Sequence, residues 1–252
     1  LYQFQPSLTG FFVQEQIIPV SEENITIETI QQDAILGQPV RWNKVISLKE
    51  PGAIKSALPS NADNIKIKGY ETNFTITGKD FVSKFLGNLG KITGGVIGTS
   101  EQELGIEIKG NSTNYEVSYE TPAPQATEQD TERGKRVKIS SPENLHYENV
   151  LAFTNLDENL NIKDDSQVKI YWLENNTYLK PSSVQDKDSD GIYDYIEWVV
   201  PSLSTQTFDI IVITKAEHLD SSRNFISDIY PAVKELDNVW SEPISNNEYV
   251  RV

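Results

Sequence analysis

Acidic side chains are concentrated between residues 186 and 197, in the stretch DKDSDGIYDYIE. Their spacing matches the calcium-loop pattern D-x-[DN]-x-[DN]-G-x5-E at each of its six defined positions. Carboxylates at alternate positions of a tightly turning loop converge on one point, and calcium accepts six to eight oxygen ligands. We therefore predict a Ca²⁺ site whose ligands are Asp186, Asp188, Asp190, the carbonyl of Ile192, Asp194 and Glu197, with Gly191 at the sharp turn.

The alternative interpretation of this stretch is an acidic, solvated turn that binds nothing. The flanking sequence indicates no amphipathic helix on either side of the loop. The segment YIEWVV alternates as a strand, with Ile196, Trp198 and Val200 on one face. The pattern thus predicts an EF-hand-like loop between β-strands, in which bound calcium would pin the following strand to its neighbours.

Other chemistry has little support in the sequence. His146 and His218 fall in different predicted domains, and H-E-x-x-H, G-x-S-x-G and cysteine are all absent. We therefore expect no enzymatic activity.

A net charge of −15 without a Lys/Arg-rich run argues against nucleic-acid binding. No apolar run of 18 residues is present, so we expect no membrane span. The chain has no methionine, so we expect Leu1 to begin a mature or excerpted piece.

Short alternating segments rich in Ile, Val, Tyr and Thr dominate the rest of the chain. With turn residues between them, they predict a mainly β fold of tandem β-sandwich domains with one or two short helices. Helical spacing of apolar residues is found only at 79–89 and 220–236, where Pro231 is expected to kink or split the second helix. The expected strands are 24–30, 40–48, 64–70, 72–78, 104–110, 114–120, 135–141, 146–155, 167–173, 195–200 and 206–214.

The predicted domain organisation has five parts. A stretch rich in Pro, Thr and charge is interpreted as a linker or a long loop between two sandwiches. The parts are an N-terminal arm or strand at 1–30, a first sandwich at 31–122, the linker or loop at 123–135, a second sandwich with the calcium loop at 136–216, and a helix plus the start of a further domain at 217–252.

Two groups of residues are candidates for surface roles. Four N-x-[ST] sequons, at Asn24, Asn73, Asn111 and Asn175, are compatible with a glycoprotein. The N-terminal segment is apolar and carries no charge before Glu15. It is either an ordinary edge strand of its own domain or a strand donated to a neighbouring subunit. The candidate subunit contacts are Tyr2, Phe4, Leu8, Phe11, Phe12 and Val13.

Several segments together resemble large multidomain cell-surface proteins of archaea, which string β-sandwich domains together and carry D-x-D-x-D-G loops. The segments are LGQPVRWNKVISL, YEVSYETPAP, GKRVKISSPENLHYENVLAFTNL, DKDSDGIYDYIEWVVPSLSTQTFDI and EHLDSSRNFISDIYPAVKELDNVWSEP. The resemblance runs from about residue 36 to the end and is most specific at the calcium loop. It implies an extracellular, structural or adhesive setting.

Three functions are compatible with these features. The first is a structural subunit of a calcium-stabilised filament, pilus-like fibre or surface layer (S-layer), with the chain itself as the partner. The second is an adhesin or carbohydrate-binding module, in which an exposed aromatic among Trp42, Trp172, Trp198 and Trp240 stacks on glycans. The first three of these lie in strand patterns and are expected in the core. The third is an accessory domain of a surface hydrolase.

Overall fold

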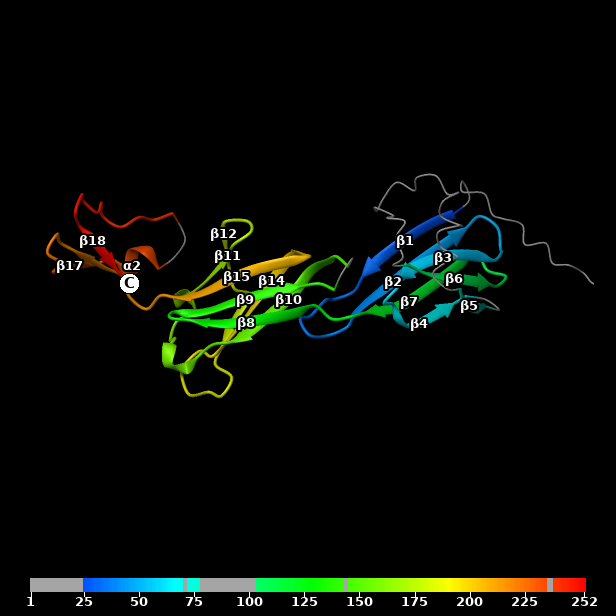
Figure 1. Ribbon diagram of the computed structural model, residues 1–252, viewed down its shortest axis with the longest axis horizontal. Helices are drawn as coiled ribbons and strands as arrows, with labels where there is room; N and C mark the ends of the chain where they lie inside the picture. The colour runs from blue at the N-terminus through cyan, green and yellow to red at the C-terminus, as the bar shows by residue number, and fades with distance from the viewer. Residues whose placement is uncertain (1–24, 70–71, 78–102, 143–144, 235–237) are drawn as a thin grey trace, which may run out of the picture. The chain divides into compact units, whose positions relative to one another are not determined.

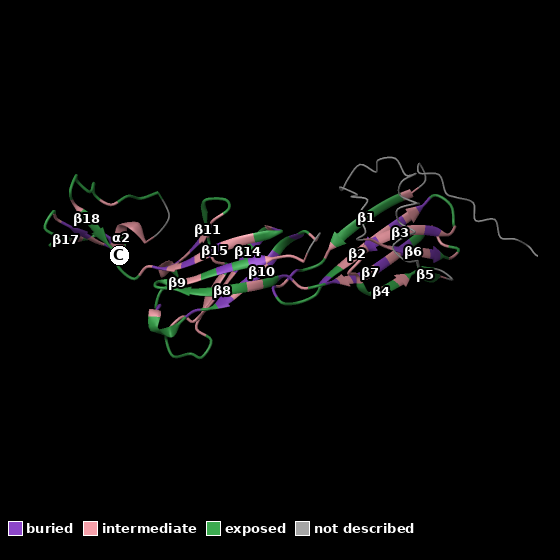
Figure 2. Cartoon of the chain, in the orientation of Figure 1, coloured by how far each residue is buried: buried purple, intermediate pink, exposed green. Residues whose placement is uncertain are grey.

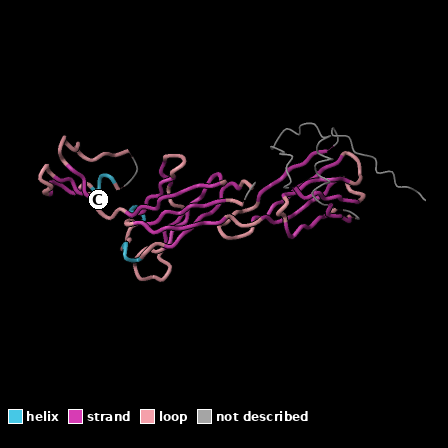
Figure 3. The backbone as a smooth tube through the Cα atoms, viewed as in Figure 1, coloured by secondary structure: helices cyan, strands magenta, loops and turns pink. Residues whose placement is uncertain are grey.

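The computed structural model describes residues 25–69, 72–77, 103–142, 145–234 and 238–252 (Figure 1). Strands make up most of these residues, and the helices among them are single turns (Figure 3). The predicted mainly β fold is therefore confirmed. No helix within the described ranges has the length and apolarity needed to cross a membrane. The expected helix at 79–89 lies outside the described residues.

The chain divides into two compact units that are not contiguous in sequence. Unit 1 comprises Lys44–Leu58 and the described parts of Leu1–Glu28 and Ile67–Val117. Unit 2 comprises Thr29–Asn43, Pro59–Lys66 and the described part of Ser118–Val252.

The first seven strands form two sheets with the orders β1-β2-β7-β4 and β3-β6-β5, and β5 pairs antiparallel with β6. Within unit 1, buried apolar side chains alternate along β2 and β6, as in Ile46, Ile106 and Ile108. This alternation is the period-two pattern that the sequence showed. The bounds are β1 (Ile25–Gln31), β2 (Val40–Leu48), β3 (Ile54–Pro59), β4 (Asp63–Lys68), β5 (Asn73–Thr77), β6 (Glu103–Lys109) and β7 (Asn114–Thr121).

Unit 2 contains a three-stranded sheet of order β10-β14-β13 and a five-stranded sheet of order β12-β11-β15-β9-β8. Neighbouring strands in both sheets pair antiparallel, as do β10 with β14 and β15 with β9. The bounds are β8 (Gln125–Thr131), β9 (Gly134–Ser140), β10 (Tyr147–Asn155), β11 (Val168–Trp172), β12 (Thr177–Leu179), β13 (Ser183–Gln185), β14 (Tyr195–Leu203) and β15 (Thr205–Val212), with short 3-10 turns η2 (Glu158–Leu160) and η3 (Asp165–Gln167).

A continuous core lies between these two sheets, and the buried residues follow their strands in Figure 2. Trp198 of β14 is fully buried and meets Phe208 of β15 edge to face, with ring centroids 5.6 Å apart. Trp172 of β11, opposite Phe208 in the same sheet, also packs on this ring, with centroids 5.8 Å apart. Aromatic residues from both sheets thus interlock, and the expected core positions of Trp172 and Trp198 are confirmed.

The remaining two tryptophans differ from this pair. Trp42 is half-buried and stacks on Tyr119, while its Nε1 donates a hydrogen bond to Thr121 Oγ1 over 2.8 Å. Trp240 is 84% exposed.

A small three-stranded sheet of order β17-β16-β18 follows the sandwich. Its strands are β16 (Glu217–Leu219), β17 (Phe225–Asp228) and β18 (Tyr249–Arg251), and one turn of helix, α2 (Tyr230–Val233), lies after β17. The helix predicted over 220–236 is therefore wrong. The Asp220 carboxylate accepts the backbone N–H groups of Ser222 and Asn224, which closes a turn in place of a helix.

The linker or long loop expected at 123–135 is also wrong, because residues 125–131 form strand β8. This strand pairs with β9 in full register from Gln125↔Ser140 to Thr131↔Gly134. It has almost no apolar side chains because it is the edge strand of its sheet and is mostly exposed. Charged residues such as Glu128 and Asp130 are typical of such edges, since they discourage pairing with another chain.

Candidate calcium-binding loop

The acidic stretch forms the loop of a β-hairpin between β13 and β14. These strands pair antiparallel, with Gln185 opposite Tyr195, so residues 186–194 lie between the paired ends. The loop is closed by a hydrogen bond from Asp194 N to Gln185 O over 3.0 Å. It is also attached to the segment before η3, because Tyr193 N donates to Ile162 O and Leu156 N donates to Asp194 O. Strands therefore flank the loop on both sides, as predicted.

Asp186, Asp188 and Asp190 converge at the tip of this loop. Each offers a carboxylate oxygen, and the three oxygens lie within 4.8 Å of one another. Asp188 and Asp190 are exposed and Asp186 is half-buried. The turn depends on left-handed backbone at Ser189 (φ 65°) and Gly191 (φ 91°). Glycine adopts such a conformation without steric cost, which explains its place in the pattern.

Backbone donors hold the first carboxylate in place. Asp186 accepts hydrogen bonds from Gly191 N over 2.8 Å and from Ser189 N over 2.7 Å, with a longer one from Asp190 N. The Gly191 N–H, followed by those of Ser189 and Asp190, lowers the pKa of the Asp186 carboxyl below its ordinary value. Asp186 is thereby kept ionised and oriented toward the other two carboxylates.

The pKa of Asp188 is shifted in the opposite direction from that of Asp186. The Asp190 N–H favours the ionised form, but burial and the neighbouring carboxylates of Asp190 and Asp186 together raise the pKa of Asp188. The three acids therefore repel one another, and a cation among them would relieve that repulsion.

The structure brings together only part of the predicted ligand set. Among the described residues, Asp194 and Glu197 lie outside the three-carboxylate group. Asp194 Oδ1 accepts the backbone N–H of Lys187 over 2.9 Å, and Glu197 Oε1 accepts the hydroxyl of Tyr195 over 3.0 Å. Glu197 belongs to β14, opposite Phe153 and Ser183. Ile192 follows Gly191 in the loop, and its N–H donates to Asp190 Oδ1 over 2.8 Å.

The chemistry of the three converging side chains fits calcium. All three supply hard oxygen donors, and no nitrogen or sulfur ligand is among them. They are close enough to share one ion, and their mutual repulsion leaves an unmet demand for positive charge. Asp186, Asp188 and Asp190 are therefore the residues that would hold the ion.

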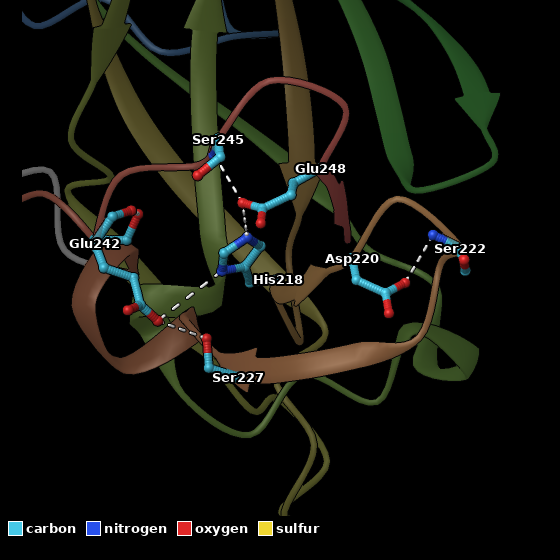
Figure 4. Close-up of polar contacts among 8 residues, drawn as sticks. His218, Asp220, Ser222, Ser227, Glu242, Ser245 and Glu248 are labelled. Atoms are coloured by element: carbon cyan, nitrogen blue, oxygen red, sulfur yellow. Dashed lines mark hydrogen bonds and ion pairs between the residues drawn. The ribbon is translucent and has the colours of Figure 1, made fainter.

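The sequence did not reveal a second polar cluster, which surrounds His218 on β16 (Figure 4). The buried imidazole lies between two carboxylates, with Nε2 2.8 Å from Glu248 Oε2 and Nδ1 3.9 Å from Glu242 Oε1. Ser227 Oγ donates to Glu242, and Ser245 N donates to Glu248. Because Glu242 and Glu248 flank the ring of His218, the cluster ties segment 238–248 to the sheet.

The other candidate residues belong to no cluster described above, or they lie outside the described residues. Asn73, Asn111 and Asn175 are exposed, and Asn175 is in the turn between β11 and β12. His146 is hydrogen-bonded to Ser202 Oγ over 3.0 Å. The positions outside the described residues are Asn24 and the six candidate subunit contacts Tyr2, Phe4, Leu8, Phe11, Phe12 and Val13.

In comparisons with known proteins, the chain matches no protein-family model and no curated protein.

Proposed function

We propose that this chain is a structural subunit of an extracellular assembly whose β-sandwich is stabilised by calcium. The observation that carries the proposal is the convergence of Asp186, Asp188 and Asp190 in the loop of the β13–β14 hairpin. β14 contributes the buried Trp198 to the core between the two sheets. An ion that fixes the loop therefore stabilises the strand on which the sandwich core depends.

The calcium part of the proposal is tested by thermal unfolding. We expect calcium to raise the melting temperature of the wild type, because an ion that binds only the folded state stabilises it by mass action. The double variant Asp188→Ala, Asp190→Ala removes two of the three carboxylates and should melt at the same temperature with calcium and with a chelator.

A matched control is the variant Asp130→Ala, Glu132→Ala, which removes the same charge from the exposed β8–β9 hairpin. It should keep the calcium response of the wild type. If the wild type melts alike with and without calcium, the loop has no structural role and this part of the proposal fails.

The assembly part rests on the sequence of the N-terminal segment, which is apolar and uncharged up to Glu15. We propose that this segment is donated as a strand to a neighbouring copy, because strand addition satisfies main-chain hydrogen bonds and buries alternate side chains. Electron microscopy of the native protein in calcium should show filaments or sheets, and deletion of residues 1–16 should abolish them. Dispersed monomers of the full chain would overturn the assembly proposal.

The second candidate is an adhesin or carbohydrate-binding module of the cell surface. It is favoured by Trp240, a residue that is 84% exposed and can stack on a sugar. A monomeric chain that binds a glycan, and loses that binding in the variant Trp240→Ala, would support this function over assembly.

A further inference from the structure

The C-terminal sheet β17-β16-β18 forms one side of a hollow of about 470 Å³. Leu219 ends β16, while Tyr249, Val250 and Arg251 form β18. Arg223 comes from the turn between β16 and β17, and Arg133 comes from the turn between β8 and β9. The residues that line the hollow therefore include one tyrosine, three aliphatic residues and three arginines.

This concentration of arginine is unusual for so acidic a chain. The sequence has a net charge of −15 and only five arginines: Arg41, Arg133, Arg136, Arg223 and Arg251. Three of the five line this hollow. Their positions are far apart in the sequence and follow no spacing, so the fold alone reveals the group.

Backbone hydrogen bonds fix the main chain at two of these arginines. Arg223 has left-handed backbone (φ 65°), which is costly for a residue with a side chain. The turn enforces this conformation, because Arg223 N donates to Asp220 O and Asp220 N donates to Asn224 O. The Arg223 guanidinium then lies 5.4 Å from the centre of the Tyr249 ring. On the hairpin turn, the carbonyl of Arg133 accepts Val212 N over 2.8 Å.

The charges in the hollow are only partly neutralised. Arg251 is hydrogen-bonded through Nε to Glu217, the residue opposite it on β16. Within the described residues, Arg133 and Arg223 form no ion pair with an acidic side chain. In this part of the chain no carboxylate neutralises these two guanidinium groups, so both can bind an anion beside the Tyr249 ring.

The His218 cluster supports the sheet from its other face. His218 and Glu217 are consecutive on β16, so their side chains point to opposite faces, and Arg251 lies on the Glu217 face. The contacts of His218 with Glu248 and Glu242 secure the segment that leads into β18 (Figure 4). The sheet that contributes Tyr249 and Arg251 to the hollow is thereby held together.

We propose that this hollow binds an acidic sugar, with the carboxylate of a uronic acid between Arg133 and Arg223. Guanidinium groups bind carboxylates with two parallel hydrogen bonds, which gives a preference for this group over a neutral hydroxyl. The apolar C–H face of a sugar ring packs on Tyr249, which is exposed and lies on the same face of the sheet as Arg251. The site does not depend on calcium or on assembly of the chain.

The test is a calorimetric titration of the full chain, in calcium, with a trimer of galacturonic acid. The neutral galactose trimer and acetate are the matched ligands. We expect the uronate trimer to bind more tightly than both, because only it offers a carboxylate and a sugar ring together. Equal binding of the neutral trimer, equal binding of acetate, or no heat with the uronate trimer would each overturn the proposal.

Variants separate this site from general electrostatics and from the calcium loop. Arg223→Gln should weaken uronate binding about tenfold, which is the loss expected when a charge-assisted hydrogen-bonded pair is removed. Arg41→Gln removes the same charge from an exposed residue outside the hollow, which pairs with Glu120, and should leave the affinity within about twofold. If Arg41→Gln weakens binding as much as Arg223→Gln, the hollow is not the site.

A further titration uses the calcium-loop variant Asp188→Ala, Asp190→Ala below its melting temperature. Uronates also bind calcium, so this variant tests whether the sugar is attached through the ion. Unchanged affinity is expected for a site in the arginine hollow. Loss of binding in a variant with native circular dichroism would place the sugar at the calcium loop instead.

Discussion

Two ionisable side chains, Lys44 and Tyr119, give the protein opposite responses to alkaline pH. Burial lowers the pKa of Lys44 from 10.5 to about 8, although the nearby carboxylate of Glu103 opposes this change. The ammonium is satisfied locally by Ser56 Oγ and by the carbonyl of Ala57. Burial also raises the pKa of the Tyr119 hydroxyl from 10.0 to about 12.

We predict that Lys44 makes the protein more stable as the pH rises from about 8 to 10.5. In this range the unfolded state still binds the proton that the folded state has released, so the free energy of unfolding increases with pH. The difference between the two pKa values corresponds to at most about 3 kcal/mol. Urea denaturation at a series of pH values should show this rise for the wild type, and the variant Lys44→Met should lack it.

For Tyr119 we predict the opposite effect: the protein loses stability as the pH rises further. Between about 10 and about 12 the unfolded tyrosine loses its proton while the folded one keeps it, so the free energy of unfolding falls. The variant Tyr119→Phe should lose less stability than the wild type over this range. If the urea midpoints of the wild type and the variant fall equally from pH 10 to 12, Tyr119 is not the cause of this loss of stability.

At the scale of elements, the start of β9 depends on a single glycine. Gly134 has φ 145°, and a Cβ atom there would lie 2.0 Å from the backbone carbonyl oxygen of Ile210 on β15. β9 and β15 are neighbours over seven residue pairs, from Thr205↔Ser140 to Ile211↔Gly134. Close approach of the two backbones therefore leaves no room for a side chain at this end.

We predict that Gly134→Ala destabilises the sandwich by about 3 kcal/mol or more, because the clash is with backbone and forces the two strands apart. Gly37→Ala is the matched control. Gly37 also has positive φ (75°), but nothing lies within 4 Å of its Cβ position. It should cost only about 1 kcal/mol of backbone strain. Chemical denaturation measures both, and equal losses would show that strain rather than the clash is responsible.

The elements also show how far sequence patterns reach. Strands with a buried face, such as β10 and β14, were predicted closely, because alternation records which side chains face the core. β8 was missed because an exposed edge strand has no buried face to record. The apparent helix at 220–236 had apolar residues four apart, but the Asp220 turn and Pro231 override that spacing.

At the scale of the whole molecule, the sequence predicted sites formed by consecutive residues and missed those formed by folding. The three loop aspartates lie within five residues, so their spacing alone indicated that they converge. Glu197 fits the same spacing, but β14 holds it in pairing with its neighbours and its carboxylate binds the Tyr195 hydroxyl. The His218 cluster joins residues 30 positions apart, and the arginine hollow joins the β8–β9 turn to β18. No spacing rule can identify either group.

The distribution of tryptophan allows the two units to be followed separately. All four tryptophans, at positions 42, 172, 198 and 240, belong to unit 2, as does the calcium loop, whereas Lys44 belongs to unit 1. Fluorescence therefore reports unfolding of unit 2, while far-ultraviolet circular dichroism reports the strands of both units.

We predict that calcium at a hundredfold excess over its Kd stabilises unit 2 by about 2.7 kcal/mol and shifts the fluorescence transition. The substitution Lys44→Met should change the circular dichroism transition and leave fluorescence unchanged. If each perturbation shifts both probes equally, the two units unfold as one cooperative body and stability cannot be assigned to either alone.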